Sequence, residues 1–376
     1  MKLNFLLMIL WMAFAQLLPA QRIITGKIID INSKQALSSA SVFLANTSFG
    51  TNTNGAGEFK LALTGNGRFN LVVAMIGYET FTREVSLQEN ITGLIIELKP
   101  RVTELEEVIV GNYDKNGWEK WGDFFMEMLI GNTPNAMKCR LLNKGAVKFN
   151  YSKKENILRA YATEPLKIEN NALGFDLTYS LIQFEHNYKT RIFYYQGYPL
   201  FTEKQFKNNR QKQKWIETRK ETYKGSLMHF MRSVFRNKIL EEGFELRRVI
   251  RQKVPSATIK INGEPMMEEV DMMINTPLNG DSIAFAIDEN TAGLKFNDYL
   301  QVVYKDKLMS SLYKKSKRNV ILGDPLTAKL FMPDSSKIVS VLANGSYFFG
   351  KDILTLDYWA WSEKLSNLLP LEYKYQ

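Results

Sequence analysis

The feature that most constrains the fold of this chain is a period-two alternation of apolar and polar side chains between residues 24 and 98. Three runs show the alternation, the third with one exception: Phe59–Leu63, Phe69–Val73 and Phe81–Val85. Such alternation is typical of β-strands that bury one face. Asn54–Gly57 and Gly65–Gly67 flank the runs and tolerate the positive φ angles of tight turns. Short strands about ten residues apart, joined by such turns, predict a β-sandwich.

The same region resembles a known family. Its landmarks, in chain order, are Gly26-x-Ile28-x-Asp30, Ala40-x-Val42, Gly50-Thr51-x-Thr53, Gly57-x-Phe59-x-Leu61 and Gly77-Tyr78. Together they resemble the carboxypeptidase regulatory-like domain, over residues 23 to 98. The resemblance implies a transthyretin-like β-sandwich that is accessory to a peptidase domain and holds no catalytic metal. Asn54 stands where this family usually has Asp, and Asn suits the turn equally well.

A second, shorter resemblance concerns the segment Glu104–Val110, whose sequence is ELEEVIV. A similar segment follows this module in the N-terminal extension of TonB-dependent outer-membrane transporters of Gram-negative bacteria. The resemblance implies a place in the cell envelope. The run Val108–Val110 either pairs with a strand of its own protein or docks on the sheet edge of a partner.

A length of 376 residues favours two domains. The expected division is a signal peptide at 1–20, the regulatory-like sandwich at 21–99, a linker at 100–117 and a second domain at 118–376. The net charge of +10 favours anionic partners such as lipid headgroups, acidic glycans or nucleic acid. The alternative is that the basic surface only keeps the protein soluble.

Residues 1–20 have the pattern of a signal peptide: Lys2 is basic, Leu3–Leu18 is apolar, and Ala20 precedes the expected cleavage point at Gln21. The alternative is a membrane anchor, but the apolar run is short for a spanning helix. We therefore expect an exported protein, periplasmic or associated with the outer membrane of a Gram-negative bacterium, without a transmembrane span after cleavage. No cysteine follows the cleavage point, so a lipoprotein is not expected. Export argues against nucleic acid as the partner.

The second domain is expected to be a strand-rich α+β domain with about two longer helices, so that the whole protein is mainly β. Apolar residues at helical spacing predict helices at Trp118–Ile130 and Ser226–Glu242, the second capped by Ser226. Aromatic and β-branched runs predict strands. These runs include Tyr151, Ile157–Tyr161, Phe175–Phe184, Arg191–Tyr195, Phe244–Val254, Ala257–Ile261, Ile283–Ile287, Tyr299–Tyr304, Lys337–Leu342 and Ile353–Leu356.

The most basic stretch is Gln205–Lys224, in which aromatic residues interrupt the positive charges. Its candidate binding residues are Lys212, Lys214, Trp215, Arg219 and Lys220. Basic side chains with aromatics between them can clamp an anionic polymer. The alternative is the solvated face of a hairpin.

The predicted helix Ser226–Glu242 carries polar residues on the side opposite its apolar stripe. His229, Arg232 and Arg236 share this side and are candidates for binding a phosphate or carboxylate. The alternative is a polar face turned to solvent.

Known catalytic motifs are absent from the sequence. The chain has two histidines, His186 and His229, and one cysteine, which is too few for a zinc site built on those residues. No His-Glu-x-x-His helix, nucleophile elbow, phosphate-binding loop or dinucleotide fingerprint occurs. We therefore predict no catalytic residues, no metal and no cofactor, while a pair of carboxylates brought together by folding stays open.

Two functions remain. The first is a non-catalytic exported envelope protein that binds or scaffolds an outer-membrane protein, a glycan or an anionic lipid surface. The second is a hydrolase acting on a glycan or peptide through a carboxylate site in the second domain. A cleft with two nearby acids would favour the hydrolase, and an exposed basic or aromatic surface would favour the binding protein.

Overall fold

The computed structural model describes residues 21–64, 67–101, 113–261, 264–316, 323–348 and 350–375. The chain divides into two compact units, one of residues 1–45 and 49–106 and the other of residues 46–48 and 107–376. The expected signal peptide and most of the expected linker, including Val108–Val110, lie outside the described residues. The domain boundaries drawn from the sequence therefore stay a prediction.

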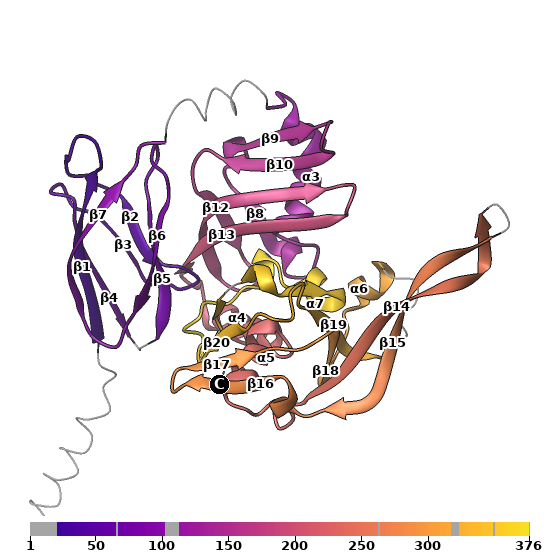
Figure 1. Ribbon diagram of the computed structural model, residues 1–376. Helices are drawn as coiled ribbons and strands as arrows, with labels where there is room; N and C mark the ends of the chain where they lie inside the picture. The colour runs from indigo at the N-terminus through magenta and orange to yellow at the C-terminus, as the bar shows by residue number, and fades with distance from the viewer. Residues whose placement is uncertain are drawn as a thin grey trace, which may run out of the picture. The chain divides into compact units, whose positions relative to one another are not determined.

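The described part of the first unit is a β-sandwich of two sheets, ordered β4-β1-β7 and β3-β2-β5-β6 (Figure 1). Its strands are β1 (Gln21–Asp30), β2 (Ser41–Leu44), β3 (Gly50–Asn52), β4 (Glu58–Thr64), β5 (Arg68–Ala74), β6 (Phe81–Ser86) and β7 (Ile91–Leu98). β1 runs antiparallel to β4 and parallel to β7. The sandwich predicted from the alternation is confirmed.

The alternation in β4 matches its burial. Phe59, Leu61 and Leu63 lie in the core, and the residues between them are exposed. The turn before β4 is built by Asn54, whose Oδ1 accepts hydrogen bonds from the backbone N–H groups of Ala56 and Glu58 at 3.0 and 2.9 Å. Asn54 thus forms the turn for which the family usually has Asp.

The first helix described in the second unit is α3 (Gly117–Leu129), which covers a six-stranded sheet (Figure 1). The sheet contains β8 (Cys139–Leu141), β9 (Val147–Ser152), β10 (Ile157–Ala162), β11 (Leu166–Asn170), β12 (Phe175–Asn187) and β13 (Ile192–Glu203). Phe125 of α3 is fully buried and packs edge-on against Phe149 of β9, with ring centroids 5.7 Å apart. The predicted helix and strands of this region are confirmed.

The rest of the second unit holds a five-stranded sheet, β15-β14-β18-β19-β22, and a four-stranded sheet, β16-β17-β20-β21. The strands are β14 (Phe244–Ile261), β15 (Glu264–Leu278), β16 (Ala284–Asp288), β17 (Thr291–Leu294), β18 (Tyr299–Leu308), β19 (Pro325–Phe331), β20 (Val339–Leu342), β21 (Tyr347–Phe348) and β22 (Leu354–Leu356). The α-helices are α4 (Asn209–Tyr223), α5 (Leu227–Phe235), α6 (Ser311–Ser316) and α7 (Asp357–Ser362). Short 3-10 turns are η2 (Ala136–Lys138), η3 (Lys144–Ala146), η4 (Gly280–Ser282), η5 (Gly350–Asp352) and η6 (Leu365–Asn367).

Helix α5 lies at the centre of this core. Its Phe230 and Met231 are fully buried, and the Phe230 ring packs 5.4 Å from the buried ring of Trp359 in α7. The predicted cap is confirmed, because Ser226 Oγ accepts a hydrogen bond from the His229 N–H at 3.1 Å. The helix ends earlier than predicted, at Phe235, because Asn237 takes a left-handed conformation with φ 52°.

Most of the basic stretch Gln205–Lys224 is a helix, α4, so the hairpin of the alternative interpretation is wrong, although several of its basic residues are exposed as that interpretation expected. Asn208 caps α4 by accepting a hydrogen bond from the Gln211 N–H at 2.9 Å. Lys, Arg, Gln and Glu fill most of the helix, and these residues have high helix propensity. The helix was not predicted from the sequence because its amphipathic pattern is weak. Only Trp215 and Tyr223 are buried in it.

Candidate functional site

Of the candidate binding residues on α4, Trp215 and Arg219 are held by the protein itself. The Trp215 ring is buried, and its Nε1 donates a hydrogen bond to the Asn171 carbonyl at 3.1 Å. The Arg219 guanidinium donates to the Leu173 carbonyl and to Glu203 Oε1, both at 2.7 Å. These two side chains therefore fasten α4 to the turn between β11 and β12 and to the end of β13.

The remaining basic side chains of α4 are directed away from the core. Lys212 and Lys214 are exposed, and Lys220 is half-buried. Arg210 and Lys207 beside them are exposed as well. The structure thus separates the predicted binding residues of α4 into an anchoring side and a basic outer side.

On the polar side of α5, His229 and Arg232 do not face solvent, so that alternative is wrong for these two residues and holds only for Arg236. Arg232 is only 7% exposed. Its guanidinium donates to three backbone carbonyls, those of Asn344, Tyr373 and Leu371, at 3.0, 2.9 and 3.1 Å. Arg232 is thereby a clamp that holds the C-terminal segment and the turn after β20 against α5.

His229 is also buried and has partners on both ring nitrogens. Nδ1 accepts a hydrogen bond from the Gly225 N–H at 3.1 Å, and Nε2 lies 3.2 Å from Glu242 Oε2. Burial lowers the pKa of His229 to about 4, although the nearby Glu242 carboxylate opposes this shift. Exposed Arg236 forms a two-pronged ion pair with the same Glu242, at 2.8 and 2.6 Å. The three candidate residues of α5 therefore do not converge on an open ligand site.

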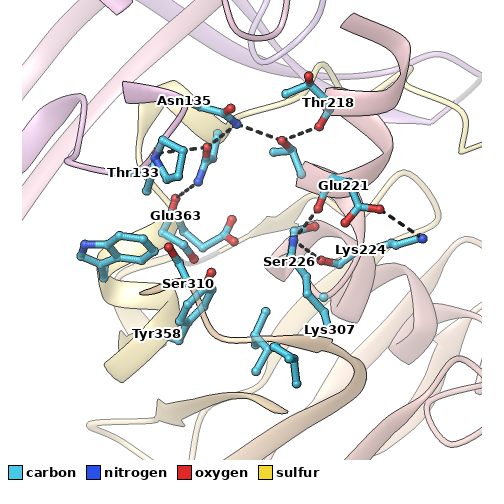
Figure 2. Close-up of a pocket in the computed structure, with 18 residues that line it drawn as sticks. Thr133, Asn135, Thr218, Glu221, Lys224, Ser226, Lys307, Ser310, Tyr358 and Glu363 are labelled. Atoms are coloured by element: carbon cyan, nitrogen blue, oxygen red, sulfur yellow. Dashed lines mark hydrogen bonds and ion pairs between the residues drawn. The ribbon is translucent and has the colours of Figure 1, made fainter. Parts of the chain in front are cut away.

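A pocket opens where α4 ends and α5 begins (Figure 2). It has a volume of about 230 Å³. Its walls come from the segment before η2, the last turns of α4, the start of α5, the end of β18, β19, and α7 with the residues after it. The lining residues are Thr133, Pro134, Asn135, Thr218, Glu221, Thr222, Lys224, Gly225, Ser226, Lys307, Leu308, Ser310, Leu326, Tyr358, Trp361, Ser362, Glu363 and Asn367.

Among the titratable groups that line this pocket, Glu363 has the most strongly shifted pKa. It follows α7 and points into the pocket (Figure 2). Burial raises the pKa of its carboxyl to about 7, while the Leu227 N–H at the start of α5 and the Lys307 ammonium both act to lower it. The carboxyl group therefore exchanges a proton near neutral pH, as a general acid or base needs to do.

The charge of Lys307 is favoured by two carboxylates of the pocket, those of Glu221 and Glu363. Its ammonium donates hydrogen bonds to the backbone carbonyls of Glu221 and Lys224, the latter at 3.0 Å. Burial lowers the pKa of Lys307. A cation at this place satisfies carbonyls at the C-terminal end of α4 and complements the helix dipole.

One wall of the pocket is a fixed polar network. Asn135 Nδ2 donates to Thr222 Oγ1 at 3.0 Å and to Asn367 Oδ1 at 2.9 Å, and Asn367 Nδ2 donates to the Ser362 carbonyl at 2.8 Å (Figure 2). These bonds connect α4, η6 and the segment before η2. The wall therefore has its shape before any ligand arrives.

Sequence reasoning missed this pocket. Glu221, Lys307 and Glu363 are far apart in the chain and show no shared motif. The sequence provided one general indication only, because it left open that folding brings two carboxylates together. Among the described residues, no group of three or more His, Cys, Asp or Glu side chains is arranged to hold a metal ion. In the same part of the chain, no helix combines the length and apolar character needed to cross a bilayer.

Comparison with known families identifies the first unit. Residues 24–110 match the model of the CarboxypepD_reg-like domain. The predicted family resemblance is confirmed for this region, which does not extend into the pocket. No curated protein matches the chain.

Solved structures resemble the chain only weakly. The backbone protein of pilus 2b from group B streptococcus is 20% identical with a TM-score of 0.19, over 23% of this chain and 43% of that one. A DUF3823 family protein from Bacteroides ovatus is 14% identical with a TM-score of 0.18, over 49% and 81%. A Bacteroides fragilis protein of unknown function, described as membrane-associated, is 12% identical with a TM-score of 0.17, over 90% and 96%.

This chain spans less than half of the streptococcal protein. The TM-scores are too low for a common overall fold to follow from them, so function has to be argued from the site.

Proposed function

We propose that this protein is an exported, non-catalytic component of the Gram-negative cell envelope that binds an anionic envelope surface through the outer side of α4. The observation that carries the proposal is the separation within α4. Trp215 and Arg219 fasten the helix, while Lys212 and Lys214 beside them extend into solvent. Export is supported by the sequence of residues 1–20, which has the pattern of a signal peptide.

The position of the positive charges on α4 favours a role in binding over a role in stability. The first turn of α4 contains no acidic residue and includes Arg210 and Lys212. Basic side chains at a helix N-terminus oppose the helix dipole, which disfavours the helix by a few tenths of a kcal/mol to about 1 kcal/mol. The same arrangement concentrates positive potential at one exposed end of the helix, where an acidic glycan or anionic headgroup would be attracted.

The test is co-sedimentation of the protein with outer-membrane vesicles across a salt series. Binding should weaken steeply as the screening length falls to about 10 Å and below. Lys212→Glu combined with Lys214→Glu should reduce binding at low salt. Binding to the vesicles that changes neither with salt nor with this double substitution would contradict the proposal.

A matched control changes the same charge elsewhere in the second unit. Lys153 and Lys154 are exposed between β9 and β10, and Lys153→Glu with Lys154→Glu alters the net charge equally. If α4 is the contact surface, this control should retain most of the binding. An equal loss in both double variants would mean that net charge, rather than α4, attracts the protein.

The pocket favours a second candidate function, a hydrolase. Glu363 and Glu221 line the same cavity, and the raised pKa of Glu363, about 7, suits a general acid. The assay is release of reducing ends or free amines from envelope glycans and peptides. Activity should follow a pH profile with an apparent pKa near that of Glu363 and should disappear in Glu363→Gln.

Exposed Glu241, outside the pocket, provides the control Glu241→Gln, which should keep the activity. No turnover by the wild type would leave the binding function alone.

A further inference from the structure

The pocket at the junction of α4 and α5 can be assigned a ligand class from its size, charge and surface. Its volume of about 230 Å³ is smaller than the roughly 300–1,000 Å³ of sites that enclose drug-sized ligands. It therefore fits a single ring or one residue of a polymer.

With the Glu363 carboxyl ionised, the charges in the pocket cancel. Glu221 and Glu363 provide two carboxyl groups, and Lys224 and Lys307 provide two ammonium groups. Lys224 Nζ lies 3.3 Å from Glu221 Oε1, and Lys307 is bound by carbonyls at the end of α4. An anionic ligand would meet the carboxylates and a cationic one would meet the ammonium groups, so both would lose hydration without a free counter-charge. A neutral ligand avoids this cost.

The pocket is apolar on one side and rich in hydrogen-bonding groups on the other. The Tyr358 and Trp361 rings, whose centroids are 5.3 Å apart, and the side chain of Leu308 provide apolar surface. The Asn135 amide and Thr222 hydroxyl hydrogens are already donated within the protein, so this wall offers acceptor oxygens, while the Glu363 carboxyl accepts and, when protonated, donates (Figure 2). A pyranose ring has the same two-sided character, because its C–H groups form an apolar face and its hydroxyl groups surround the rim.

We propose that this pocket binds one uncharged sugar residue, with the ring against Trp361 and the hydroxyl groups directed at Glu363 and the Asn135–Thr222 wall. The site is separate from the exposed lysines of α4 and would hold a neutral unit of an envelope glycan. The hydroxyl groups would both donate and accept there. A wall with fixed geometry lowers the ordering cost of binding.

The experiment titrates the full chain from Gln21 with methyl glycosides of glucose, galactose and N-acetylglucosamine, by calorimetry and tryptophan fluorescence. At least one should bind with a Kd of the order of 1–10 mM, the weak range expected for a single small ring. Glucuronate, glucosamine and an uncharged dipeptide amide are the comparison probes, and each should bind about tenfold more weakly or not at all.

Two conservative variants test the location. Glu363→Gln and Thr222→Val each keep the shape of the side chain and should each weaken binding of the neutral glycoside about tenfold, the effect of losing one good hydrogen bond. Trp361→Phe should also alter the fluorescence response. Unfolding midpoints measured on each variant show whether the fold is kept.

The outcomes separate this proposal from the function assigned to α4. Lys212→Glu with Lys214→Glu should leave glycoside binding unchanged even where it abolishes binding to vesicles. The sugar site is overturned if no neutral glycoside binds up to roughly 50 mM, well above a millimolar Kd. It is also overturned if a charged probe or the dipeptide amide binds more tightly, or if both folded pocket variants bind as the wild type does.

Discussion

Helices α4 and α5 are neighbours in the chain and both carry basic side chains, but α4 exposes several of its cations whereas α5 buries its own. On α4, Lys212 and Lys214 are exposed and only the aromatic side is buried. On α5, His229 and Arg232 are buried and bonded to other parts of the second unit. A basic residue at helical spacing thus says little about exposure until the elements around the helix are known.

The difference follows from what surrounds each helix. α5 packs against β17 and β20, and the C-terminal residues 371–373 close over Arg232. α4 is anchored by one side alone, through Trp215 and Arg219. Buried cations need several fixed acceptors, which α5 obtains from backbone carbonyls, whereas exposed cations need only water. The comparison predicts that substitutions on α5 and on the anchoring side of α4 affect stability, and those on the outer side of α4 do not.

The largest expected effect is that of Trp215→Ala, which would detach α4. Deletion of a buried tryptophan leaves a cavity and an unpaired Asn171 carbonyl, and should lower the free energy of unfolding by about 4 kcal/mol. Urea denaturation measures this change. Trp215→Phe is the control and should recover more than half of the loss. A cost below about 1 kcal/mol would show that the anchoring side contributes little.

Arg232→Ala should come next. It leaves three partly buried backbone carbonyls without their charged donor, at a cost of roughly 3 kcal/mol. Arg236→Ala, at the C-cap of the same helix, removes the ion pair between exposed Arg236 and Glu242 and should cost no more than about 1 kcal/mol. Thermal and urea unfolding of both variants gives the comparison directly. Equal losses would contradict the distinction between the buried and the exposed arginine.

The third prediction concerns pH. The pKa of His229 is about 4 in the folded protein, below the ordinary value of 6.5, so the unfolded chain binds more protons between these values. The stabilising contribution of neutral His229 is therefore complete above pH 6.5 and is lost as the pH falls toward 4. The full effect is roughly 3 kcal/mol, since one pKa unit corresponds to about 1.4 kcal/mol.

Glu363 acts in the opposite direction and must be separated from His229. Its pKa of about 7 lies above the ordinary 4.5, so the folded protein binds more protons and loses stability as the pH rises from 4.5 to 7. Unfolding curves from pH 4 to 8 should therefore rise more steeply with pH in Glu363→Gln than in the wild type. Addition of His229→Gln to that variant should flatten the rise, and an unchanged slope would contradict the assignment.

The smallest expected effect on stability belongs to Lys212→Glu with Lys214→Glu. Both side chains are exposed, and exposed charges contribute within about 0.5 kcal/mol. The thermal midpoint should change little, and this would make the variant a clean test of vesicle binding. A large loss of stability would place these lysines on the anchoring side and remove the basis of the proposed surface.

Sequence reasoning succeeded where local pattern and burial agree. Strands β4, β5 and β6 of the sandwich were predictable from alternation, which reports a half-buried face, and β10 from its run of aromatic and β-branched residues. It failed for α4, whose apolar side is narrow, and for β15 (Glu264–Leu278), which was not among the predicted strands. Most of β15 is exposed on both faces, including Met266, Met267 and Met272, so no alternation marks it. In Figure 1, β14 and β15 extend as a hairpin beyond the rest of their sheet.

The amino-acid sequence by itself determined the β-sandwich of the first unit, the mainly β character of the second, and the presence of a buried helix starting at Ser226. These depend on the spacing of apolar residues and on turn and cap residues, which act within a few positions of one another. Only the tertiary structure decided that Arg232 is buried and Lys212 exposed, and that Glu363, Lys307 and Glu221 line one pocket. Burial and pKa depend on which distant segments pack together, and no local pattern in this chain records that packing.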